Sequence, residues 1–132
     1  AAAVREADII SCATLSRMPL VEGAWLRPGQ HVDLVGAYTP EMRESDDAAV
    51  RAAMVFVDTR EGALKEAGDI VQPLRAGEID DDDVLADLYA LCRGAHRGRE
   101  PADRDGITLF KSVGAALEDL AAAELTVERA AP

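Results

Sequence analysis

The feature that most constrains the fold of this chain is a repeated alternation of short apolar runs with helical patterns. Runs rich in isoleucine, valine or leucine cover residues 7–14, 31–37, 52–58 and 107–110. The first three are apolar on both faces, which is typical of strands that are covered on both sides in a parallel sheet. Strand followed by helix, repeated along the chain, predicts an α/β fold with a parallel sheet and crossover helices.

The helical patterns lie between and after these runs, and each has a recognisable start or stop signal. We expect four helices: one with Ser45 as its N-cap, one from Thr59 to a stop at Gly68, one that follows the acids Asp80–Asp83 and stops at Gly94, and one from Ala115 to about Arg129. The four acids are expected to complement the positive N-terminal end of the third helix.

Composition excludes several classes of function. The net charge of -11 disfavours binding to nucleic acid and to anionic lipid, both of which attract basic surfaces. No apolar stretch approaches the roughly 20 residues that span a bilayer. His31 and His96 lack neighbours at ligand spacing, and Asp80–Asp83 lacks the spacing of a calcium loop, so we expect no metal site. Cys12 and Cys92 lie in no motif, which favours two buried thiols in a reduced, cytoplasmic setting.

A ligand site is expected where the strands end, because ligands of open parallel sheets bind outside the carboxyl ends of the strands. Small residues and hydroxyls gather at these ends: Cys12-Ala13-Thr14, Gly36-Ala37-Tyr38, Asp58, and Lys111-Ser112 with Gly114 close behind. Such residues suit a flat ligand that lies close to the backbone. An alternative interpretation remains open, in which glycine and small polar residues merely end the strands.

The ten glycines include no Gly-x-Gly pair, so the chain lacks the first turn that cradles phosphates in a dinucleotide-binding sheet. That turn belongs to the first half of a doubly wound sheet. We therefore interpret residues 1–112 as the C-terminal half of a Rossmann-type domain. Residues 113–132 are interpreted as a helix that returns to another domain, formed in part by an absent N-terminal segment.

Taken in order, the segments "ADIISCAT", "PLVEGAWLRPGQHVDLVGAYTPEMRESDD", "MVFVD" and "GITLFKSVGAALEDLAAAEL" resemble the C-terminal part of the ornithine cyclodeaminase/mu-crystallin family. The resemblance covers nearly all 132 residues. It implies a two-domain, homodimeric enzyme in which a Rossmann domain holds NAD or NADP. The dimer would form through the other domain, and the substrate would be a small amino or imino acid.

The resemblance also implies roles for individual residues at the strand ends. Cofactor contacts are expected from the first, second and last strand ends: Cys12, Ala13, Thr14, Val35, Gly36, Ala37, Lys111 and Ser112. Val113 and Gly114 match positions beside the substrate, and Gly114 would let the next helix begin without crowding the site.

One departure from the family pattern separates the possible reactions. The deaminase branch carries a catalytic aspartate in a Gly-x-Asp-x-Pro segment, whereas Tyr38 occupies that position in Gly36-Ala37-Tyr38-Thr39-Pro40. A phenol is a poor base at neutral pH, although it can donate a hydrogen bond, so Tyr38 is either a catalytic proton donor or a wall of the site. The sequence therefore favours an NAD(P)H-dependent reductase of a cyclic imino acid of the Δ1-pyrroline-2-carboxylate type. Two alternatives are an ornithine cyclodeaminase-type lyase and a mu-crystallin-like binding protein.

Overall fold

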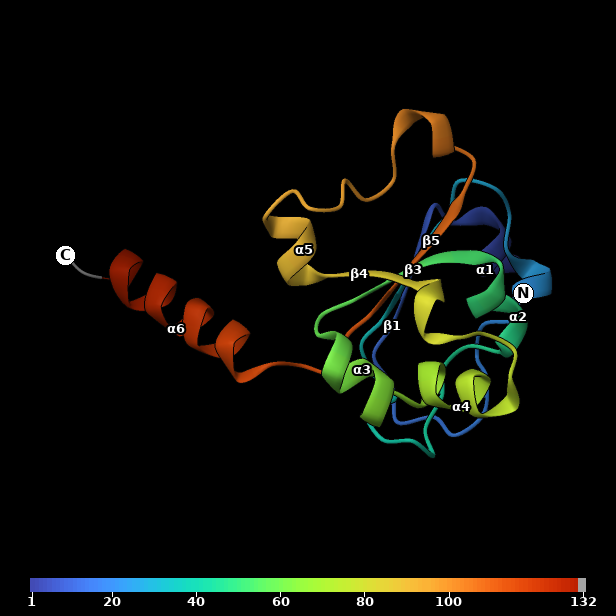
Figure 1. Ribbon diagram of the computed structural model, residues 1–132, viewed down its shortest axis with the longest axis horizontal. Helices are drawn as coiled ribbons and strands as arrows, with labels where there is room; N and C mark the ends of the chain where they lie inside the picture. Colours follow the sequence, from blue (N-terminus) through green and yellow to red (C-terminus); the bar gives the residue numbers. More distant parts are fainter. Residues whose placement is uncertain (131–132) are drawn as a thin grey trace.

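A computed structural model describes residues 1–130 and contains one sheet of five parallel strands (Figure 1). The strands are β1 (Ile9–Cys12), β2 (His31–Leu34), β3 (Ala53–Val57), β4 (Val84–Asp87) and β5 (Ile107–Lys111). Their order across the sheet is β1-β2-β5-β3-β4, so the last strand in the chain lies at the centre. The predicted α/β fold with a parallel sheet is confirmed.

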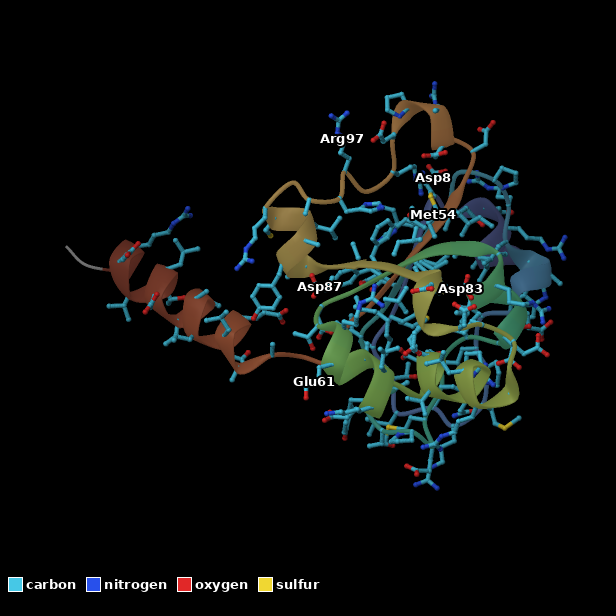
Figure 2. The ribbon with its side chains drawn as sticks, viewed as in Figure 1. Asp8, Met54, Glu61, Asp83, Asp87 and Arg97 are labelled. Carbon is cyan, nitrogen blue, oxygen red and sulfur yellow. The ribbon has the colours of Figure 1, made fainter. Side chains whose placement is uncertain are left out.

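Helices and single 3-10 turns connect the strands. The α-helices are α1 (Ala2–Glu6), α2 (Asp47–Arg51), α3 (Arg60–Glu66), α4 (Gly68–Ala76), α5 (Leu88–Cys92) and α6 (Ala116–Ala130), and the 3-10 turns are η1 (Gly23–Trp25), η2 (Asp81–Asp83) and η3 (Pro101–Asp103). α4 packs against both α2 and α3, and these three helices lie beside the strands in Figure 1. Figure 2 shows Glu61 pointing outward from α3 and Arg97 pointing outward from the loop after α5.

The sequence interpretation missed the strand β4 and did not predict the helix α4. Residues 84–87 pair with β3 as a parallel strand, and the helix is confined to Leu88–Cys92. Val84 and Ala86 are buried while Leu85 is exposed, which is the alternation of a strand. The same apolar residues also fit a helical period, and pairing with β3 decides between the two conformations. The acids at 80–83 consequently form a 3-10 turn before a strand instead of capping a helix.

Two of the expected helix boundaries are also wrong, and both involve close packing. Asp46, and not Ser45, caps α2 by accepting from the backbone N–H of Ala49. Gly68 does not end α3, because it is the first residue of α4. A Cβ at Gly68 would lie 1.8 Å from the carbonyl oxygen of Met42, so this glycine is required by close approach of two backbones. Thr59 caps α3 as predicted.

The core lies between the sheet and its helices. Its fully buried strand residues are Val32, Leu34, Val57 and Leu109. Cys12 and Cys92 are free thiols, but Cys12 is only partly buried and Cys92 is exposed, so the expectation of two buried cysteines is wrong. Within residues 1–130, no helix is both long enough and apolar enough to cross a bilayer.

The final helix, α6, was predicted within one residue at each end. It leaves the sheet after β5 and projects away from the other elements (Figure 1). None of its residues is buried, and its leucines and Val127 are about half or more exposed. Residues 131–132, the end of the predicted C-terminal segment 113–132, lie outside the described residues.

Candidate functional site

Four strand ends meet at one edge of the sheet. The parallel register aligns Cys12 with Leu34, Leu34 with Lys111, and Lys111 with Val57. Backbone hydrogen bonds continue past the last paired residues, because Val35 donates to Cys12 at 2.8 Å and Ser112 donates to Leu34 at 3.0 Å. We call the turns that follow these strands the strand tips: residues 12–14, 35–37, 58 and 111–114. Every strand end that the sequence singled out therefore belongs to the same edge.

Asp58 organises the tip of β5. Its side chain is buried, and Oδ2 accepts from the Ser112 hydroxyl at 3.0 Å and from the backbone N–H groups of Val113 and Gly114 at 2.8 and 2.7 Å. Oδ1 accepts from the Thr59 backbone N–H at 2.6 Å. Four donors on one carboxylate fix the turn at 112–114 and occupy the Ser112 hydroxyl hydrogen. Sequence reasoning placed Asp58 at a strand end but gave it no role.

The backbone of Gly114 gives it a role that the sequence interpretation did not include. No atom of the chain lies within 4 Å of the position that a Cβ would occupy, so the glycine is not required by packing within the chain. Its backbone φ is +88°, in the left-handed region that other residues rarely adopt. The glycine is needed for the turn between β5 and α6.

Glu44 joins the tips of β1 and β2. Its side chain is fully buried, with Oε1 accepting from the Thr14 backbone N–H at 2.5 Å and Oε2 accepting from the Gly36 backbone N–H at 2.9 Å. The two tips also touch directly, because a Cβ on Gly36 would lie 2.1 Å from the Thr14 carbonyl oxygen. The glycine is thus required by close approach.

Lys111 and Asp69 form a buried pair beneath the tips. Both side chains are fully buried, and Lys111 Nζ lies 3.7 Å from Asp69 Oδ2 and 3.3 Å from the Gly36 carbonyl oxygen. Burial lowers the pKa of the Lys111 ammonium, although Asp69, Glu44 and Asp58 oppose that shift. Burial likewise raises the pKa of Asp69 against its hydrogen bonds and the lysine. Because the Lys111 side chain is fully buried, its ammonium lies beneath the tips and supports them from below.

The tips expose a mixture of small and apolar groups. Ala13, Val35 and Gly114 are exposed, as is Tyr38 directly after the β2 tip, and the partly buried tip residues are Cys12, Thr14, Ser112 and Val113. Gly36, Ala37 and Lys111 are buried. Burial, and then the charges of Glu44, Asp69 and Asp33, raise the pKa of the Cys12 thiol, which keeps it protonated and poorly nucleophilic.

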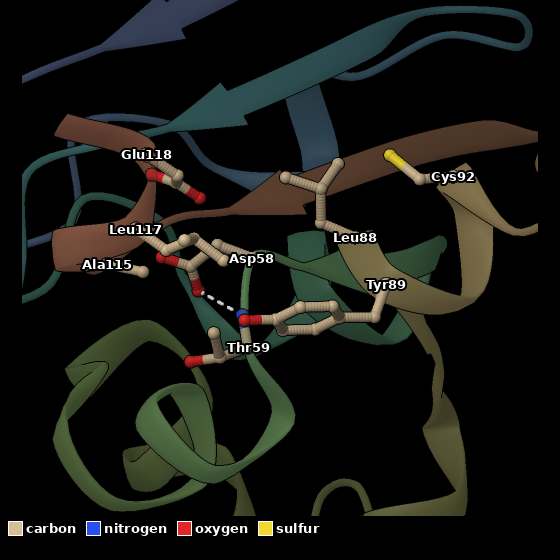
Figure 3. Close-up of a pocket in the computed structure, with 8 residues that line it drawn as sticks. All are labelled: Asp58, Thr59, Leu88, Tyr89, Cys92, Ala115, Leu117 and Glu118. Carbon is tan, nitrogen blue, oxygen red and sulfur yellow. Dashed lines mark hydrogen bonds between the residues drawn. The ribbon is translucent and has the colours of Figure 1, made fainter. Parts of the chain in front are cut away.

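An apolar cavity of about 190 Å³ opens beside Asp58 at the same edge (Figure 3). In Figure 3 its walls come from the end of β3, from α5 and from the start of α6, which contribute Asp58, Thr59, Leu88, Tyr89, Cys92, Ala115, Leu117 and Glu118. The cavity extends the candidate ligand site from the strand tips toward α6. Sequence reasoning did not predict this cavity, since it depends on the misassigned β4–α5 segment.

Glu44 and Asp69 were also missed by the sequence interpretation. Glu44 belongs to "PEMRESDD", which has the composition of a solvated loop, and Asp69 follows a glycine at the start of a helix. A single sequence does not distinguish a buried acid from an exposed one in such segments. A usable signal existed only at Lys111, because a lysine at the end of a central strand requires a buried partner.

Comparison with known proteins shows which class of protein this chain is similar to. The structure resembles that of Thermococcus litoralis Δ1-pyrroline-2-carboxylate reductase in complex with NADH and L-proline, with a TM-score of 0.91 and 42% identity over 98% of this chain and 39% of that one. The Paracoccus denitrificans Δ1-pyrroline-2-carboxylate reductase is 49% identical over 90% of the chain and 37% of its own length. Mouse ketimine reductase mu-crystallin is 40% identical over 96% of the chain and 37% of its own length.

The fold is thus that of parallel α/β proteins related to imine reductases. The chain matches the ornithine cyclodeaminase/mu-crystallin family over residues 1–132 and belongs to that family. It spans less than two fifths of the length of the relatives described above.

Proposed function

We propose that this chain supplies one wall of the dinucleotide cleft of an NAD(P)H-dependent reductase that acts on a small cyclic imino acid. The observation that carries the proposal is the alignment of the tips of β1, β2, β5 and β3 at one edge of a parallel sheet. Ligands of such sheets bind at that edge. The names of the Thermococcus, Paracoccus and mouse relatives support imine reduction as the reaction.

The residues at the tips fit a dinucleotide. Ala13 is small and exposed, Gly36 lets the β1 and β2 tips approach each other closely, and the Asp58 carboxylate holds the turn at Ser112. A flat ring system can approach such a surface closely. We assign Cys12, Ala13, Thr14, Val35, Gly36, Ala37 and Ser112 to the cofactor wall, with Lys111 below it, and Val113 and Gly114 to the substrate side. The phosphates would be held by a glycine loop elsewhere in the protein, because these 132 residues contain none.

Bound NAD(P)H would supply the hydride that is added to the imine carbon. The chain's own contribution is to orient the two reactants and to place a proton donor near them. Tyr38 is our candidate donor, because it occupies the position of the deaminase aspartate and its side chain is exposed beside the β2 tip. A phenol suits donation to a substrate that already contains the C=N bond better than it suits abstraction of a proton.

The proposed reaction is tested with the full-length protein that contains this segment. We expect oxidation of NADH or NADPH to depend on Δ1-pyrroline-2-carboxylate, with proline as the product. Conversion of ornithine to proline and ammonia would replace this proposal with a cyclodeaminase. Tight binding of the dinucleotide without turnover of either substrate would indicate a binding protein.

The variant Tyr38→Phe is expected to lower kcat of the full-length enzyme by about 10²-fold, the lower range for loss of an acid–base group. The dissociation constant for NADH should change little, because the ring remains and only the hydroxyl is lost. Stopped-flow reduction kinetics and fluorescence titration of NADH measure the two quantities. An unchanged kcat would make Tyr38 a wall of the site and not a donor.

The 132-residue chain on its own is expected to show no reductase activity and only feeble binding of NADH. The reason is that it holds neither a phosphate-binding glycine loop nor basic residues for the substrate at its exposed strand tips. Turnover of Δ1-pyrroline-2-carboxylate by the isolated chain, measured by NADH absorbance, would contradict the half-domain interpretation.

We also propose that residues 1–112 form the second half of the Rossmann-type domain and that the segment from 113 onward connects to another domain. The exposed leucines of α6 support this, because an exposed apolar helix is stabilised by packing on another surface. The same domain would form a homodimer. The free thiols Cys12 and Cys92 support the cytoplasm as the compartment.

A further inference from the structure

Beyond the backbone hydrogen bond from Val35 to Cys12, a buried carboxylate joins the tips of β1 and β2. Each oxygen of Glu44 accepts from a different tip, Thr14 in one case and Gly36 in the other. The backbone of Glu44 also binds the loop after β1, because its carbonyl oxygen accepts from the N–H groups of Leu20 and Val21. Glu44 therefore joins the β1 tip, the β2 tip and the loop between them.

Glu44 is itself fixed from α4. Asp69 Oδ1 accepts from the backbone N–H groups of Glu44 and Ser45, each at 2.8 Å, and from the Ser45 hydroxyl at 2.9 Å. Asp69 Oδ2 has no hydrogen-bond partner but lies 3.7 Å from Lys111 Nζ. The lysine reaches the carbonyl oxygen of Gly36, whose N–H is held by Glu44. Buried charges therefore hold both backbone groups of Gly36, because Glu44 accepts from its N–H and Lys111 donates to its carbonyl oxygen.

Stability alone does not account for this cluster. Replacement of buried ionic groups by well-packed apolar side chains is often neutral or stabilising, because desolvation offsets much of the attraction between the charges. A charged cluster also fixes the local geometry, because each carboxylate oxygen holds a particular N–H group in position. The N–H groups that Glu44 fixes belong to the two tips assigned above to the cofactor wall.

We propose that Glu44 is a positioning residue that sets the spacing between the β1 and β2 tips and thereby the affinity for the dinucleotide, an inference that rests on the proposed function. Glu44 does not touch the ligand, and it acts through Thr14 and Gly36. The substitution Glu44→Gln tests this, because an amide has one acceptor oxygen and an NH₂ group that would face a backbone N–H. One of the two tips must then lose its partner.

The experiment uses the full-length protein and NADH as the probe. For Glu44→Gln we expect the dissociation constant and the KM for NADH to rise about tenfold, as for loss of one charge-assisted hydrogen bond. At saturating NADH, kcat and the KM for Δ1-pyrroline-2-carboxylate should stay within about twofold of the wild-type values. A purely structural role would lower kcat in proportion to the loss of folded protein and would leave the dissociation constant and both KM values unchanged.

A matched control faces the same loop from α4. Gln72 donates to the carbonyl oxygen of Pro40 at 2.9 Å and contacts neither tip. The variant Gln72→Met should therefore weaken the 40–44 loop without changing the affinity for NADH. If Gln72→Met raises the dissociation constant as much as Glu44→Gln does, loop stability and not tip spacing controls affinity, and the proposal is wrong.

Hydrogen–deuterium exchange gives a readout that does not depend on activity. In Glu44→Gln, the amide of Thr14 or of Gly36 should exchange faster than in the wild type, while amides in β3 stay unchanged. Should Glu44→Gln fail to fold, Glu44→Asp keeps the charge but is too short to reach both N–H groups, and the same two changes are expected. Unchanged exchange and unchanged affinity in the folded variant would overturn the proposal. A wild-type protein that does not bind NADH would instead overturn the proposed function, and exchange at Thr14 and Gly36 would still decide whether Glu44 holds the tips.

Discussion

The variant Lys111→Met is expected to lower the free energy of unfolding by about 3–5 kcal/mol, the usual cost of removing one partner of a buried ion pair. The Lys111 side chain is fully buried, and its ammonium lies 3.7 Å from Asp69 Oδ2. Methionine fills most of the same space but leaves the Asp69 and Glu44 carboxylates buried without a counter-charge. Chemical denaturation of the full-length protein measures the loss.

Two comparisons separate the charge from the shape of this side chain. Adding Asp69→Asn to Lys111→Met should restore part of the lost stability, because the asparagine keeps an acceptor for Glu44 and Ser45 without the unpaired charge. Lys65→Met serves as the exposed control, since Lys65 pairs with Glu61 in solvent at 2.7 Å and should contribute little. A loss in Lys111→Met no larger than that in Lys65→Met would contradict the account of a buried pair.

The variant Gly36→Ala is expected to lower kcat/KM of the full-length enzyme by about 10²-fold, the scale associated with a displacement of about 1 Å in a reacting group. Its Cβ would lie 2.1 Å from the Thr14 carbonyl oxygen and 2.3 Å from Glu44 Oε1. The backbone oxygen cannot rotate away as a flexible side chain can. The β1 and β2 tips must therefore separate, which changes the wall that they form.

Gly77→Ala is the matched control for Gly36→Ala. Gly77 ends α4 with a φ of +70° and has nothing within 4 Å of its Cβ position, so alanine there costs stability through backbone strain alone. We expect Gly77→Ala to lower the melting temperature and to leave kcat/KM unchanged. Steady-state kinetics of both variants against NADH measure the contrast. Retention of wild-type kcat/KM by Gly36→Ala would contradict the close packing of the two tips.

The sequence was sufficient for the parts of this fold that depend on local pattern. Apolar runs located β1, β2, β3 and β5, and parallel topology then required their ends to share an edge. β4 was missed because "VLAD" has apolar residues that fit both a strand and a helix, and only pairing with β3 selects the strand.

The burial of the acids beneath the tips could not be predicted from sequence patterns for a related reason. Glu44 and Asp69 are 25 residues apart and meet only when α4 packs beside the loop after β2. Neither has a neighbour in sequence that marks it as buried. Lys111 was expected to contact the cofactor, but its side chain is fully buried against partners that the fold brings beneath the tips.

The central claim is that the tips of β1, β2 and β5 form one wall of a dinucleotide cleft. It is tested most directly by hydrogen–deuterium exchange of the full-length protein with and without saturating NADH. The account predicts slower exchange on binding in residues 12–16, 34–38 and 111–115, with no change in η2 at Asp81–Asp83, which lies before β4. Binding of NADH that leaves all three tip segments unprotected would contradict the claim.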